Sequence, residues 1–217
     1  MASEALTTSA PHVGRVVEGF RSLKVAALLQ IVAWILGIAS IVSLFGALLG
    51  GALLKPEALL AGGLASVVLM LIVLILVIVS VYKYLLASAK SFAEWKPEEF
   101  STPRKLLKVG LLYGAIITLV GLLVLAGGIA SMQLPPLLAG GAIALVGGIL
   151  FLIGWIGYII FLLRLRGAFK STILLVAAIL AILSIVLGGV LNFIAWILTY
   201  IEASSLEKKV ASGTIQV

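Results

Sequence analysis

The sequence predicts an all-α protein, a polytopic transmembrane helix bundle of about five spans with a short N-terminal interfacial helix. Of its 217 residues, 63% are hydrophobic and only 11% are charged, and the mean hydropathy is +1.33. A soluble domain carries about 25% charged residues, so this composition is typical of a chain surrounded by lipid. Five apolar runs are long enough to cross a bilayer, whose hydrocarbon core takes about 20 helical residues.

The apolar runs divide the chain into a tail with an amphipathic helix, a transmembrane bundle and a second tail, at 1–24, 25–201 and 202–217. The spans are expected at 25–54, 58–82, 106–130, 138–163 and 172–201. Pro103 and Pro136 suit a first helical turn, where no backbone N–H is needed. Ser171 suits the N-cap of the last span.

Residues 13–24 have one apolar helical face before the first span. The apolar positions are Val13, Val16, Val17, Phe20 and Leu23. A helix that lies in the cytoplasmic interface fits this pattern, and so does a simple extension of the first span.

The distribution of Lys and Arg predicts a cytoplasmic N-terminus. In that orientation the inner segments hold twelve of the 15 basic residues, and the outer segments hold Lys55, Lys208 and Lys209. Short loops rich in Lys and Arg stay on the cytoplasmic side of the cell membrane. Five spans then place the C-terminus outside. Anionic headgroups account for the net charge of +7, so no nucleic-acid partner is expected.

The stretches 147–157 and 188–198 resemble each other, with six identities in eleven positions. A parallel repeat requires both stretches to run in one direction, which would break the last region into a hairpin at Gly188 and Gly189. Residues 173–187 form only about 22 Å of helix, too short to cross alone. One long span over 172–201 is therefore favoured, and the hairpin remains the alternative.

Glycine stripes predict close packing between the third and fourth spans. Each span has a glycine every seven residues, at Gly114, Gly121 and Gly128 and at Gly140, Gly147 and Gly154. Small residues let helix backbones approach in a membrane, where lipid gives helices no hydrophobic reason to associate. These two spans are expected to form a tight antiparallel pair.

The segment 83–105 is the only sizeable polar stretch between spans. Its aromatic residues Phe92, Trp95 and Phe100 alternate with charged residues. This mixture suits the headgroup region, where rings lie at the interface and charges reach water. An interfacial loop that follows the membrane and a loop that binds a partner both fit.

The residues needed for catalysis or metal binding are missing. The chain has no Cys and no Asp, and its single His is His12 in the tail. Neither a Ser-His-Asp triad nor a set of zinc ligands can be built from these residues. The centres of the spans hold no ionisable residue, although such residues mark proton relays and ion coupling. We expect no enzymatic activity, no cofactor and no metal.

Two amide side chains remain within the spans, Gln30 and Asn192. Each needs a hydrogen bond from another helix, from the backbone or from a partner protein. In the five-span topology Gln30 lies near the inner end and Asn192 in the outer half of the bilayer. The two side chains are therefore not expected to meet.

Three segments, 18–24, 100–106 and 188–202, resemble a family of archaeal multi-pass membrane proteins that is catalogued only as a domain of unknown function. The resemblance implies an archaeal source and no known activity. The scarcity of Asn, Gln and Cys is also reported for thermophiles.

The expected function is that of an accessory or structural subunit. It would pack in membrane lipid against other transmembrane proteins or against copies of itself. The alternative is a small oligomeric pore or facilitator for a neutral solute or an ion, lined by hydroxyls such as those of Ser80, Thr118 and Ser184.

Overall fold

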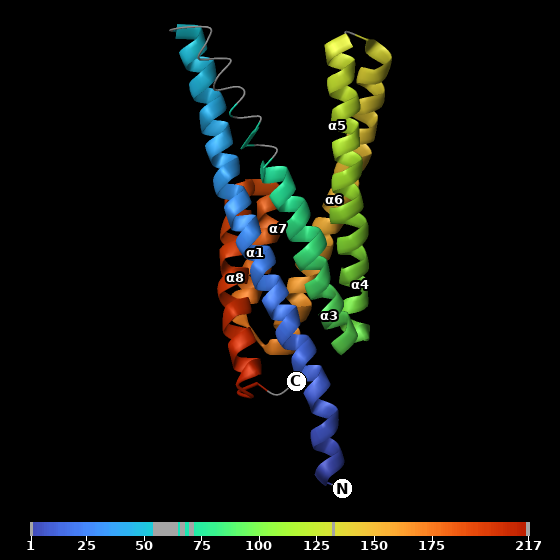
Figure 1. Cartoon of the computed structure of the whole chain (residues 1–217), viewed down its shortest axis with the longest axis vertical. Coiled ribbons are helices and arrows are strands. Elements are labelled where there is room, and N and C mark those ends of the chain that lie inside the picture. Colours follow the sequence, from blue (N-terminus) through green and yellow to red (C-terminus); the bar gives the residue numbers. More distant parts are fainter. Residues whose placement is uncertain (1, 54–64, 66–67, 70–71, 132, 216–217) are drawn as a thin grey trace.

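A computed structural model describes residues 2–53, 65, 68–69, 72–131 and 133–215. This part of the chain is helical and contains no strand. The elements are α1 (Ala2–Leu53), π-helical η1 (Ser80–Leu85), α3 (Leu86–Trp95), α4 (Pro97–Leu107), π-helical η2 (Lys108–Tyr113), α5 (Gly114–Ser131), α6 (Leu134–Phe169), α7 (Thr172–Leu187) and α8 (Gly189–Ala211). Figure 1 shows them as long rods along one axis.

Five helices of the described part are long and apolar enough to cross a membrane. They are His12–Ser43, Ile72–Trp95, Pro97–Leu125, Leu134–Phe169 and Gly189–Ala211. These helices indicate a multi-pass integral membrane protein with an all-α fold. The junction expected between the first two spans, with Lys55 and Pro56, lies outside the described residues.

The single span expected over 172–201 is wrong, because the chain folds there into the α7–α8 hairpin. The N-cap of α7 is formed as expected, since Ser171 Oγ accepts a hydrogen bond from Leu174 N at 3.2 Å. The helix ends at Leu187, and Gly188 has φ +100°. A residue with a Cβ rarely adopts that angle, so glycine permits the reversal.

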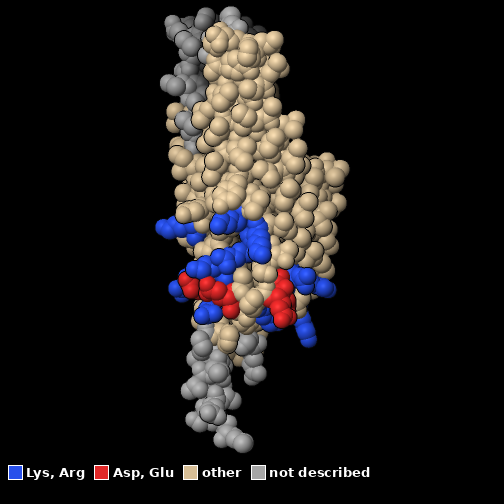
Figure 2. Space-filling view, turned by 90° about the vertical axis from the view of Figure 1, so that its right-hand side faces the viewer, with Lys and Arg blue, Asp and Glu red and all other residues tan. Residues whose placement is uncertain are grey.

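The hairpin brings the C-terminal end of α8 back to the N-terminal half of α1. Glu207 of α8 pairs with Lys24 and, at 3.2 Å, with Arg21. The two chain ends, expected on opposite sides, therefore lie at the same end of the bundle (Figure 1). We call this the polar end, because Lys, Arg and Glu gather in one band there (Figure 2).

The amphipathic segment 13–24 continues into the first span without a break, because α1 is one helix. Val16, Phe20 and Leu23 are completely buried. Their face packs against protein rather than lying in a lipid interface. Of the two alternatives for this segment, an interfacial helix and an extension of the first span, the structure has the extension.

The loop expected over 83–105 is wrong, because η1, α3 and α4 make this segment helical, with its only break at Lys96. Its position at the membrane interface stays a prediction. Phe92 and Phe100 are completely buried, and Trp95 lies against both. The Phe92 ring also packs edge-on against the Phe20 ring of α1, with centroids 5.0 Å apart. Together with Phe161 and Phe169 of α6, these rings form an aromatic cluster inside the polar end.

All six glycines of the two stripes lie where α6 meets η2 and α5. A Cβ added to Gly114 would lie 2.7 Å from Phe151 N, and one added to Gly128 would lie 2.6 Å from Leu137 N. Gly121, Gly140, Gly147 and Gly154 face backbone atoms of the other helix at least as closely. Nothing larger than hydrogen fits at these positions, so the backbones touch along the whole length of α5.

Candidate functional site

A cavity of about 350 Å³ lies between α1, η1 and the helix leading into it, η2, α6 and α8. Its volume falls within the range of small-molecule sites, about 300–1,000 Å³. The lining residues are Gln30, Ala33, Trp34, Gly37, Ile38, Ile41, Val73, Val77, Val81, Leu111, Phe151, Trp155, Asn192 and Trp196. None of these residues is charged, so the cavity suits an uncharged and mainly apolar occupant.

The α7–α8 hairpin closes one side of the cavity. The Trp34 indole lies so close to Gly189 that any side chain there would collide with it. Trp155 Nε1 donates to Ala181 O of α7 at 3.1 Å, which ties α6 to the hairpin. The reversal at Gly188 thus brings the first turns of α8 beside α1.

Gln30 has partners inside the protein. Its Nε2 donates to Ser80 Oγ at 3.3 Å, and Ser80 Oγ donates to Ala26 O at 2.9 Å. Only 7% of Gln30 is exposed. The hydrogen bonds join α1 to η1 at the wall of the cavity, and π-helical turns of this kind are frequent at functional sites.

Asn192 and Trp196 differ from Gln30, because each keeps a buried polar atom without a hydrogen-bond partner. These atoms are Asn192 Oδ1 and Trp196 Nε1. The Trp196 ring is held by stacking on Tyr158, with centroids 4.4 Å apart, and Tyr158 Oη shares a hydrogen bond with Thr199 Oγ1 at 3.0 Å. An unpaired buried polar group costs about 1–3 kcal/mol, and neither atom has accessible surface through which a molecule in the cavity could reach it.

Gln30 and Asn192, expected to stay apart, line the same cavity. The expectation was wrong because it followed from a continuous last span. Folding back at Gly188 reverses the direction of α8 and brings Asn192 to the level of Gln30. Asn192 also borders a smaller neighbouring pocket with Ser184 and Gly189.

The two similar stretches 147–157 and 188–198 meet at this cavity. Both α6 and α8 run toward the polar end, where Phe169 packs on Phe20 and Glu207 pairs with Lys24. Phe151 and Trp155 of the first stretch correspond to Asn192 and Trp196 of the second, and all four residues line the cavity. The similarity was visible in the sequence, but its meaning depended on the hairpin.

The hydroxyls proposed for a pore are engaged within the protein where the structure describes them. Thr118 Oγ1 donates to Gly114 O of its own helix at 2.8 Å, and Ser184 Oγ donates to Ala181 O at 2.8 Å. Ser80 is bonded to Ala26. These side chains come from separate contacts and do not form one lining.

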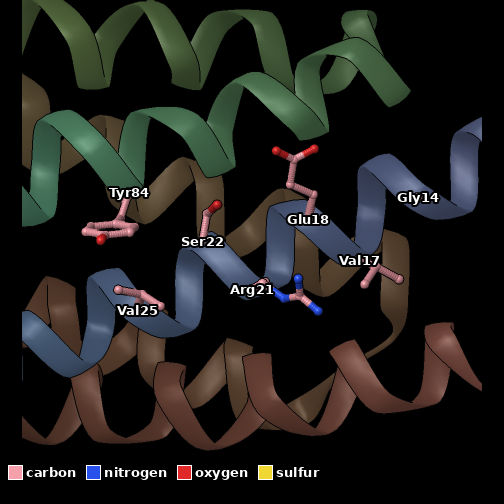
Figure 3. A pocket seen from close by; sticks show the side chains of 7 residues that line it. All are labelled: Gly14, Val17, Glu18, Arg21, Ser22, Val25 and Tyr84. Atoms are coloured by element: carbon pink, nitrogen blue, oxygen red, sulfur yellow. The ribbon is translucent and has the colours of Figure 1, made fainter.

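A second hollow lies on the surface at the polar end. Figure 3 shows its lining, six residues of α1 from Gly14 to Val25 together with Tyr84 of η1. Glu18 and Arg21 point to different sides of α1 (Figure 3). Arg21 is bonded to Glu207 of α8 and its side chain is 70% exposed. The hollow therefore offers a solvated surface rather than an enclosed site. Within the described residues, no three His, Cys, Asp or Glu side chains come together as metal ligands.

Fold and cavity define the class of the protein, a polytopic helical membrane protein with an uncharged site among its helices. Residues 16–217 match the family described as "Protein of unknown function (DUF973)", and the chain belongs to that family. The match agrees with the resemblance to an uncharacterised family. No curated protein matches the chain, and no solved structure does.

Proposed function

We propose that this chain is a non-enzymatic membrane protein that binds a small, uncharged, mainly apolar molecule in the intramembrane cavity. The observation that carries the proposal is a cavity of about 350 Å³ among the helices, with no charged residue in its lining. Small-molecule sites are lined mainly by apolar and aromatic side chains with a few polar groups.

The proposal includes a topology with both chain ends in the cytoplasm. Lys208 and Lys209, expected outside, lie on the same helix end as Glu207, which pairs with Lys24. Loops and helix ends rich in Lys and Arg stay in the cytoplasm. Both termini then lie on the inner side of the membrane.

In this topology the α7–α8 hairpin enters and leaves the membrane on the cytoplasmic side. Its tip touches Trp34, and α8 runs about 18 residues, about 27 Å, from Gly189 at the tip to Glu207 at the polar end. That is close to the thickness of a hydrocarbon core of about 30 Å. The tip is also apolar and open, with Val186 83% exposed, which suits lipid and not water. The cavity then lies near the middle of the bilayer.

The test compares two glycines of α1. A Cβ at Gly37 or at Gly46 meets no atom within 4 Å, but only Gly37 lines the cavity. Wild-type protein extracted in native lipid is expected to carry a small molecule at fixed stoichiometry, measured by mass spectrometry after organic extraction. Gly37→Leu fills the cavity and should lose the molecule, whereas Gly46→Leu should keep it. Equal amounts in both variants, or no molecule in wild type, would refute the proposal.

An accessory role in a membrane complex is the second candidate. Gly141 and Gly148 form another seven-residue pair on α6, and a Cβ there meets nothing closer than Leu125 Cδ1 at 4.0 Å from Gly141. This open pair could receive a second transmembrane helix. Gentle extraction should then recover a partner at fixed stoichiometry, or a homo-oligomer, which Gly148→Leu disrupts. A wild-type monomer would remove this candidate.

A further inference from the structure

An open hollow of about 450 Å³ lies on α8 at the polar end. Its lining consists of Ile201, Ser204, Ser205, Lys208 and Lys209, so it combines two ammonium groups and two hydroxyls with one isoleucine and contains no acidic residue. Figure 1 shows α8 at the edge of the bundle. We propose that this hollow binds the phosphate group of an anionic phospholipid. The site is separate from the cavity and does not rest on the proposed function.

The two ammonium groups of the hollow are not neutralised by carboxylates. Lys208 and Lys209 are exposed, and neither forms an ion pair with a described residue. Glu207, their neighbour in sequence, is paired with Lys24 and Arg21, and its side chain is only 12% exposed. The hollow therefore carries a positive charge that an anion can neutralise.

A phosphate group matches the donors of the hollow. Ammonium and hydroxyl groups both donate hydrogen bonds, and phosphate oxygens are strong acceptors. Ser204 and Ser205 are partly exposed, and neither hydroxyl is bonded to another described residue. A zwitterionic headgroup matches less well, because its own cation would meet two ammonium groups and no carboxylate.

The last carbonyl groups of α8 do not oppose an anion, because the chain that follows already uses them. Lys208 O accepts from Ser212 N at 2.9 Å, and Lys209 O accepts from Ile215 N at 3.2 Å. Carbonyl groups left free at a helix end would repel a phosphate. The charge of the two lysines is thus available to a ligand.

An apolar strip on α8 continues from the hollow toward the hairpin tip. Val190, Ile194 and Ile201 are 70%, 39% and 49% exposed. With 3.6 residues per turn, these three residues and Lys208 point within about 40° of one another. The strip can therefore contact an acyl chain while the hollow holds the headgroup. A free phosphate would use the hollow alone, so the strip favours a lipid.

Lipid competition tests the site on the full chain. The protein in detergent is titrated with dioleoylphosphatidylglycerol, which is anionic, and with dioleoylphosphatidylcholine, which has the same chains and is zwitterionic. Native mass spectrometry counts the bound lipids. Wild type is expected to bind the anionic lipid more tightly. Lys208→Gln combined with Lys209→Gln should weaken its binding about 25-fold, since each lysine near an anionic headgroup contributes a factor of about five.

Lys105→Gln combined with Lys108→Gln is the matched control. Both lysines are exposed, neither forms an ion pair with a described residue, and both lie outside the hollow. The control removes the same charge and should keep the anionic lipid bound. An equal loss in both double variants would overturn the site, because the attraction would then come from the polar end as a whole.

Two further measurements separate the hydroxyls and the source of the phosphate. Ser204→Ala combined with Ser205→Ala keeps the charge and should lose part of the affinity. Inorganic phosphate at millimolar concentration should leave the anionic lipid bound, because it cannot contact the strip. Displacement by inorganic phosphate would overturn the lipid and assign the hollow to a soluble phosphate. Equal affinity of wild type for the two lipids would overturn the proposal entirely.

Discussion

At the scale of single residues, the fold depends on glycines that cannot be enlarged. A Cβ on Gly154 would lie against Leu111 N and 2.6 Å from the carbonyl carbon of Gly110. Both are backbone atoms, which cannot turn aside as a flexible side chain can. The contact between α6 and η2 therefore has no room to absorb a methyl group.

Gly154→Ala is expected to force α6 away from η2 and to destabilise the protein by about 1–3 kcal/mol, the usual cost of overpacking. The measurement is thermal unfolding in a fixed detergent. Gly148→Ala on the same helix is the matched control, because its Cβ meets no atom within 4 Å. It should leave the unfolding temperature unchanged or raise it slightly, since alanine favours helix. Equal destabilisation by both changes would contradict the close contact.

At the scale of elements, one substitution distinguishes the α7–α8 hairpin from a continuous helix over 172–201. It should lower the stability of the hairpin and raise the stability of the continuous helix. Gly188 has φ +100°, an angle that costs a residue with a side chain about 1–3 kcal/mol. Gly188→Ala should therefore destabilise the protein. In a continuous helix over 172–201 the same change would stabilise it by about 1 kcal/mol. Unfolding temperatures of wild type and variant decide the sign, and a rise would contradict the hairpin.

The sequence revealed helices more reliably than their direction. Glycine spacing was sufficient to identify the surfaces that join α5 and α6, because a seven-residue repeat stays on one side of a helix. The reversal at Gly188 had only a weak signal, the similarity of 147–157 to 188–198, and the shortness of 173–187 argued against it. A loop in water carries polar residues, but the residues around Gly188 are as apolar as the helices they connect.

The candidate site was only half visible in the sequence. Gln30 and Asn192 stood out as costly polar residues in apolar spans, but their joint position required the hairpin. The sequence does not single out Trp196, because its unpaired Nε1 is evident only once its neighbours are known. Phe92 and Phe100 seemed interfacial because their spacing resembles an aromatic belt, and only the packing of α3 and α4 on α1 shows them to be buried.

At the scale of the whole molecule, the topology is open to a direct test because the chain has no cysteine. Ser212 and His12 lie exposed toward the polar end, and Ser131 lies exposed at the far end of α5. Ser212→Cys and His12→Cys should react with an impermeant reagent only after cells are permeabilised, whereas Ser131→Cys should react in intact cells. Reaction of Ser212→Cys in intact cells, with His12→Cys protected, would restore the five-span topology.

The aromatic cluster has a consequence for how the protein comes apart. Six rings from α1, α3, α4 and α6 are packed at the polar end, where the surrounding medium is partly aqueous and the hydrophobic effect drives them together. The glycine contact of α5 and α6 lies in lipid and depends on close backbone packing. Urea weakens the first kind of core, and detergents that compete with helix contacts weaken the second. The two contacts should therefore be lost in a different order in the two agents. Urea should disrupt the aromatic cluster first, and a competing detergent should disrupt the contact between α5 and α6 first.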